Sequence, residues 1–89
     1  MTDTVRLWLV ERSYDDRNLI TLVYATPEGD GMLQKEIAAT IMHQRGSAAT
    51  AAIDVEPDRV DDVADEADRE RYATEAARMA EQHDPDDEV

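Results

Sequence analysis

The side chains of this chain that could do chemistry are mainly carboxylates. Asp54, Glu56 and Asp58 have the spacing of the first three ligands of an EF-hand calcium loop. The sixth position of such a loop requires glycine for its sharp turn, but Arg59 stands there, and Pro57 lies inside the loop. We therefore predict no specific calcium site in this segment, only a hydrated acidic face that attracts cations diffusely.

The two histidines are the only other candidates for metal ligands. His83 lies next to Asp84 and close to Asp86 and Asp87, and an imidazole with carboxylates can hold a transition metal. A structural site needs several fixed ligands, and nothing in this terminal segment orients the ring. The only other histidine is His43, so a two-histidine site would require the two to meet on adjacent helices. We predict no bound metal.

Catalytic chemistry has little support in this sequence. Glu11 and Asp15 could form an acid–base pair, but with 22 acidic side chains in the chain, chance proximity is the default explanation. The chain has no cysteine, and it lacks the nucleophile-elbow, phosphate-loop and dinucleotide-binding motifs. We predict a non-catalytic protein with no cofactor. The alternative is an enzyme or small-ligand protein with a pocket between sheet and helix, lined by Arg6, Arg12 or His43.

Negative charge is concentrated in the second half of the chain. The net charge is −13, with 22 acidic and 9 basic side chains, and Lys35 is the only lysine. Residues 1–53 have a net charge of −2 and residues 54–89 a net charge of −11. Molar salt shortens the Debye length to about 3 Å and screens such repulsion, while carboxylates keep the surface hydrated. This composition indicates a protein of a salt-loaded cytoplasm.

The charge also argues against several partners. Nucleic-acid phosphates would be repelled by so acidic a chain. No apolar run approaches the roughly 20 residues of a membrane span, and the N-terminus lacks the basic start of a signal peptide. We predict a cytoplasmic protein that binds neither nucleic acid nor membranes. An acidic helix that mimics nucleic acid in a partner's groove is an alternative, although net charge alone does not identify a target.

Alternation of apolar and polar residues predicts two strands near the N-terminus, at residues 4–14 and 19–26. The segment between them has Asp15, Asp16 and Asn18, which favour a turn, so the strands should form an antiparallel hairpin. The sequence PEGDG at residues 27–31 is the strongest turn signal in the chain.

Residues 32–45 have two interpretations. Leu33, Ile37 and Ile41 recur at helical spacing among good helix formers, and Gly46 could end the helix. The alternative is a third strand that forms a hairpin through the PEGDG turn, with Leu33, Lys35 and Ile37 on one face. We favour the helix.

The second half of the chain predicts a strand at residues 50–56 and a short helical turn at 57–63, with Pro57 in its first turn. A longer helix is expected at 66–82, capped by Asp65 or Asp68. The fold class is then α+β: a small antiparallel sheet of three to four strands with a C-terminal helix and room for one further helix. Residues 1–83 would form a single domain, and residues 84–89 a flexible acidic tail.

Self-association is the most specific positive expectation. Both predicted N-terminal strands have apolar residues on both faces, and so short a chain has few helices to cover them. Sheets with two apolar faces require burial on both, and two-fold dimers are the commonest oligomers. We predict a homodimer whose interface includes Trp8, Val10 and Val23. An unknown protein partner is a further option.

Two stretches of the chain resemble small acidic proteins of halophilic archaea. These are LVYATPEGD (residues 22–30) and RERYATEAARMAEQHDPDDEV (residues 69–89). The resemblance implies a short, single-domain protein adapted to high salt. That group has no assigned activity, so the resemblance transfers no functional residues.

Overall fold

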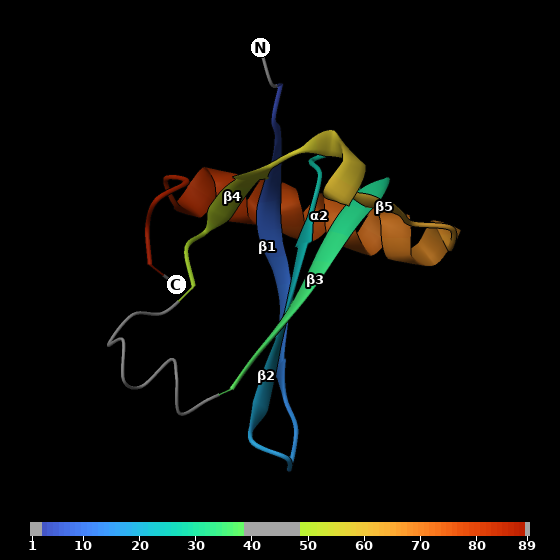
Figure 1. The fold of residues 1–89 in the computed structure, drawn as a ribbon. Helices are drawn as coiled ribbons and strands as arrows, with labels where there is room; N and C mark the ends of the chain where they lie inside the picture. Colours follow the sequence, from blue (N-terminus) through green and yellow to red (C-terminus); the bar gives the residue numbers. More distant parts are fainter. Residues whose placement is uncertain (1–2, 39–48, 89) are drawn as a thin grey trace.

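The computed structural model describes residues 3–38 and 49–88, which form an antiparallel sheet of five strands with one long helix against it (Figure 1). The order across the sheet is β4 (Ala52–Val55), β1 (Val5–Tyr14), β2 (Leu19–Ala25), β3 (Gly31–Ala38) and β5 (Asp61–Asp62). The expected α+β class is confirmed. The sheet has one strand more than the upper expectation because a two-residue strand, β5 (Asp61–Asp62), pairs with its edge.

The first hairpin consists of β1 (Val5–Tyr14) and β2 (Leu19–Ala25), close to the expected ranges. Its turn is fixed by Asp15, whose carboxylate accepts hydrogen bonds from the N–H groups of Arg17 (2.9 Å) and Leu19 (3.2 Å). Asn18 has φ 67°, a left-handed conformation that asparagine tolerates in turns. The register shifts between Leu9 and Glu11, so β1 contains a bulge at Val10.

The third segment is a strand, and the helix expected from residue 32 is wrong over the described residues. β3 (Gly31–Ala38) pairs with β2 along its length, from Ala25 opposite Met32 to Leu19 opposite Ala38. The residues of this segment favour a helix by propensity. As a strand, however, they form cross-strand side-chain pairs with β2, and these pairs contribute more to stability than the propensity does. Residues 39–45 of the expected helix lie outside the described residues.

The expected strand at 50–56 is β4 (Ala52–Val55), which pairs with the start of β1. The short helix expected at 57–63 is a 3-10 turn, η1 (Pro57–Arg59), which begins at the proline and ends before β5. β4 and β5 form opposite edges of the sheet, yet only residues 56–60 join them. A flat sheet would hold these edges about 19 Å apart. The 3-10 turn rises only about 2 Å per residue, so residues 56–60 are too short to span that distance. The sheet must therefore curl, which brings its two edges closer together.

The helix expected at 66–82 is confirmed as α2 (Glu66–Gln82). Its N-cap is Asp65, whose carboxylate accepts hydrogen bonds from the N–H groups of Ala67 (2.8 Å) and Asp68 (3.2 Å). Two arginines of α2 contact groups on and beyond the helix. Arg69 donates to the carbonyl of Val63, and Arg71 pairs with Glu11 at 3.2 Å and Asp68 at 3.4 Å.

The sheet has two apolar faces, and each contributes to the core. α2 covers one face, where Trp8 and Ala52 pack with Ala76, and Val23 packs with Tyr72. The opposite face is the concave side of the curl, where Leu7 (0% exposed) and Leu22 (1% exposed) are the largest fully buried side chains described. Val60, from the connection between β4 and β5, packs on this concave face.

The segment after α2 lies along the free edge of β4. The N–H of Ala51 donates to the carbonyl of Asp87 (2.8 Å), and the N–H of Ala52 to that of Pro85 (3.0 Å). Thr50 and Glu88 form an antiparallel bridge. Residues 84–88, which the sequence assigned to a flexible tail, are therefore placed as a backbone partner of the sheet. The flexibility of this segment stays a prediction.

Candidate functional site

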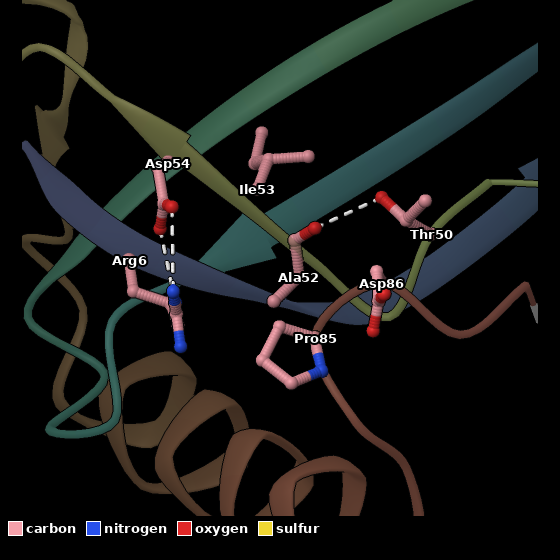
Figure 2. Close-up of a pocket in the computed structure, with 7 residues that line it drawn as sticks. All are labelled: Arg6, Thr50, Ala52, Ile53, Asp54, Pro85 and Asp86. Carbon is pink, nitrogen blue, oxygen red and sulfur yellow. Dashed lines mark hydrogen bonds and ion pairs between the residues drawn. The ribbon is translucent and has the colours of Figure 1, made fainter.

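A hollow lies where the C-terminal segment meets β4. It encloses about 410 Å³, and Figure 2 shows the side chains around it. Its lining comes from β1, β4 with the residues before it, and the C-terminal segment: Arg6, Thr50, Ala52, Ile53, Asp54, Pro85 and Asp86. The volume is in the range of small-molecule sites, but the hollow lies at the sheet edge rather than between sheet and helix.

The charged centre of this hollow is a forked ion pair. Arg6 and Asp54 are cross-strand partners, with Nε 3.0 Å from Oδ1 and Nη2 3.3 Å from Oδ2. The hydrogen bond from Arg6 lowers the pKa of Asp54, and the same bond raises the pKa of Arg6. Both side chains are about half exposed, so solvent screens the pair. Each group is occupied by the other, which leaves neither poised as an acid or base.

The remaining polar groups of the hollow offer little chemistry. The hydroxyl of Thr50 donates to the carbonyl of Ala52 at 2.8 Å (Figure 2). A nucleophilic hydroxyl needs a neighbouring base to take its proton, and this one has a backbone carbonyl as its partner. Asp86 is exposed at the rim. The hollow could hold a small cation-bearing molecule between Asp54 and Asp86, but it has no nucleophile–base pair among its lining residues.

A second hollow of about 190 Å³ lies at the bulge of β1, beside α2. Its charged lining residues are Glu11, Arg12 and Glu75, and the apolar ones are Leu9, Val10 and Met79. Glu11 is paired with Arg71, so the helix is tied to the sheet at this point. A wall of mixed charge does not form a metal site, and no group of three or more metal-ligating side chains occurs among the described residues.

The structure separates the residues that the sequence offered for chemistry. Glu11 contacts Arg71 of α2, whereas Asp15 accepts the backbone bonds of the first turn, so they do not form an acid–base pair. His83 caps the end of α2, with Nδ1 3.9 Å from the carboxylate of Asp87. His43 lies outside the described residues. Asp54 pairs with Arg6, whereas Glu56 is the N-cap residue of the exposed η1 turn and Asp58 lies within that turn.

The residues expected to form a dimer interface lie under α2. Trp8 is 8% exposed and Val23 is 3% exposed, and Val10 packs beside both clusters. Within one copy, α2 occupies the position that a second copy was expected to fill. Association through this face would require α2 to move, and the structure of a single chain does not test it.

Comparison with known proteins places the chain in a family through its whole length. A model described as a family of unknown function (DUF7967) matches residues 1–89. The chain belongs to DUF7967. No curated protein and no solved structure matches it. Membership of DUF7967 agrees with the expectation of an uncharacterised group, and it assigns no activity, substrate or partner. Among the described residues, no helix has the length and apolar character needed to cross a membrane.

Sequence reasoning missed one surface of this DUF7967 member. Tyr14, Ile20 and Ile37 form a cross-strand row at the far end of β1, β2 and β3. Tyr14 is 65% exposed, which makes it the only large apolar side chain in the described residues that is exposed. Its hydroxyl donates to the side chain of Asn18 at 2.7 Å. The strand register was the missing signal, because Ile37 joins this row only if residues 31–38 are a strand.

Proposed function

We propose that this protein is a non-catalytic interaction module that self-associates, most simply as a homodimer, in a high-salt cytoplasm. The observation that carries the proposal is the apolar core between sheet and helix. Trp8, Ala25, Tyr72 and Ala76 fill this space, and Thr26 is the only buried polar side chain among the described residues. Because a catalytic or ligand pocket here would need buried polar groups, the dry core favours a protein that acts through its surface.

One exposed and two partly buried apolar side chains at one end of the sheet support association. Tyr14 is exposed, and Ile20 and Ile37 beside it are partly buried. α2 packs on the face opposite to this row, so it does not cover it. Apolar side chains gathered at one exposed site are a common mark of protein contacts. Self-association through the uncovered part of the sheet requires no rearrangement of α2.

The distribution of charge supports a salt-rich setting. α2 has acidic residues in its first turn and no basic residue in its last turn. No basic side chain of the last turn therefore stabilises the negative C-terminal end of the helix dipole. Repulsion among these carboxylates weakens as the Debye length falls to about 3 Å near 1 M salt. We infer that both the folded chain and its association are favoured by molar KCl.

Light scattering across a range of KCl and protein concentrations tests this function. The expected result in molar KCl is a particle of twice the chain mass of 10.0 kDa, with dissociation on dilution. A particle of single-chain mass at every salt and protein concentration, with the fold intact by circular dichroism, would overturn self-association.

The second candidate is a small-ligand protein that uses the hollow around Arg6 and Asp54. Its support is the volume of about 410 Å³ and the presence of the Asp54 and Asp86 carboxylates in its lining. A cationic probe such as tetramethylammonium should then shift the amide resonances of Thr50 and Asp86 in a saturable way. Asp86→Asn should weaken that binding, with Glu70→Asn on the exposed side of α2 as the matched control. Shifts that grow linearly with probe concentration would exclude a site.

A further inference from the structure

The outer edge of β3 has backbone groups that lack a strand partner among the described residues. The carbonyl of Asp30 accepts from Val63 on the β5 side, whereas that of Gly31 accepts from Thr26 on the β2 side, so even-numbered residues face outward. β5 covers the edge only at Gly31 and Met32. The backbone N–H and C=O groups of Gln34, Glu36 and Ala38 therefore point away from the sheet, available to another strand.

The opposite edge of the sheet is covered at its start by the C-terminal segment. Residues 85–88 run along the start of β4, with hydrogen bonds to Ala51 and Ala52 and a bridge to Thr50. Of the two sheet edges in the described structure, the β3 edge is thus the longer free one. A molecule with one such edge pairs with a second copy and stops, since the pairing consumes the edge of both, whereas two open edges would extend into a fibre.

The charge of this edge also suits a second copy. Residues 33–38 have one basic and one acidic side chain, Lys35 and Glu36, and therefore no net charge, in a chain of net charge −13. Two copies repel each other least where they present neutral surface. The strand is also partly apolar, with Leu33, Ile37 and Ala38 half-buried.

We propose that two copies join through antiparallel pairing of β3 with β3 of the second copy, which extends the sheet across the dimer. This inference rests on the proposed self-association and assigns its surface. The two-fold axis is perpendicular to the sheet, because that is the symmetry that relates two identical antiparallel strands side by side.

Available hydrogen bonds select the register. With the axis at Glu36, Gln34 lies opposite Ala38 of the second copy and Glu36 opposite its own counterpart, so all three outward residues are paired. With the axis at Lys35, Ala38 would lie opposite Met32 of the second copy, which already pairs with Asp61 of β5. The Glu36 register is therefore the one that the edge can complete.

This register makes the dimer dependent on salt. It places two Glu36 carboxylates opposite each other across a hydrogen-bonded pair, with Cα atoms about 5.5 Å apart. Like charges in this position destabilise a sheet, and a Debye length of about 3 Å in molar salt screens them. Glu36→Gln should shift dimerisation to lower KCl, whereas Glu70→Gln on α2 should leave it unchanged.

Cross-linking tests the register directly, because the chain has no cysteine of its own. In the Glu36→Cys variant, the Cα atoms of the two cysteines would lie within the separation that a disulfide accepts, about 4.4–6.8 Å. In molar KCl under mild oxidation, this variant should form a covalent dimer at least roughly tenfold faster than Glu70→Cys, because pairing raises the local thiol concentration. Lys35→Cys should also be slow.

Each outcome is decisive. Fast cross-linking of Glu36→Cys alone supports the register, and fastest cross-linking of Lys35→Cys overturns it. A dimeric mass by light scattering without either cross-link overturns the β3 interface but leaves self-association standing. A single-chain mass overturns both. Glu36→Pro adds an independent test: it removes an outward N–H and should yield a folded monomer, with folding checked by circular dichroism. A folded Glu36→Pro dimer would contradict the proposal.

Discussion

Gly29 lies directly against the backbone of Arg69, so that a Cβ atom on this glycine would stand 2.1 Å from the Arg69 carbonyl oxygen. The same atom would stand 2.9 Å from the N–H nitrogen of Ala73. Gly29 also has a φ angle of 75°, which residues with a side chain rarely adopt. The turn between β2 and β3 therefore packs directly against α2. The absence of a side chain at Gly29 permits both the turn conformation and this close contact.

Replacing this glycine should be costly. Gly29→Ala combines a left-handed conformation with a backbone clash, and we expect a loss of about 2 kcal/mol or more in the free energy of unfolding. Denaturant titration in molar KCl measures it. Glu28→Ala, one residue earlier and exposed, is the matched control and should change stability by less than about 0.5 kcal/mol. Equal stability of the two variants would show that the turn is not seated on α2.

The N-cap of α2 gives a second prediction. Asp65→Ala removes the acceptor for the N–H groups of Ala67 and Asp68, and should lower the free energy of unfolding by about 1 kcal/mol. Asp65→Asn keeps an oxygen acceptor and should retain most of that stability. If Asp65→Asn loses as much as Asp65→Ala, the effect comes from charge and not from capping.

The pair of Arg6 and Asp54 predicts a specific response to pH. The hydrogen bond from Arg6 holds the pKa of Asp54 below its unfolded value. The stability that the pair contributes is therefore present above the unfolded pKa and is lost as pH falls through the folded pKa. In Arg6→Gln, the pKa of Asp54 followed by carboxyl-carbon NMR should rise towards its ordinary value. The pKa of Asp15 is lowered by hydrogen bonds that outweigh its desolvation, and it should not move in this variant.

Docking of the C-terminal segment can be measured by hydrogen exchange. Deletion of residues 84–89 removes the acceptors of the Ala51 and Ala52 N–H groups. Each amide then loses the hydrogen bond that protects it, so its exchange should accelerate by roughly tenfold or more. The amide of Val63, bonded to Asp30, is the internal control and should be unaffected. Unprotected Ala51 and Ala52 amides in the intact chain would mean that the segment is a mobile tail, as its composition suggests.

The sequence predicted those elements whose signals are local. The first hairpin follows from alternation in β1 and β2 and from the turn chemistry of Asp15 and Asn18. α2 follows from its apolar stripe and from the cap at Asp65. Each of these depends on residues that are close together in the chain, and each was located to within about one or two residues, the usual margin for an element boundary.

The features that the sequence did not specify, among them the one wrong element at residues 32–38, depend on residues that are distant in the chain. Residues 32–38 favour helix by propensity, but β2 is an open apolar edge, and pairing with it gains more than propensity loses. The covering of Trp8 and Val23 by α2 depends on where the helix packs, which its own sequence does not specify. The hollow around Arg6 likewise depends on contact between residues 50–54 and 85–86, which sequence spacing does not predict.

The length of the short connection from β4 to β5 determines the curvature of the sheet. Because residues 56–60 must reach from one edge to the other, their number fixes how tightly the strands wrap around Leu7 and Leu22. Substitutions on the exposed surface of this link leave its span unchanged, whereas one or two added residues would let the strands relax outwards and loosen the interior. The fold then depends on the length of this link more than on the identity of its exposed residues.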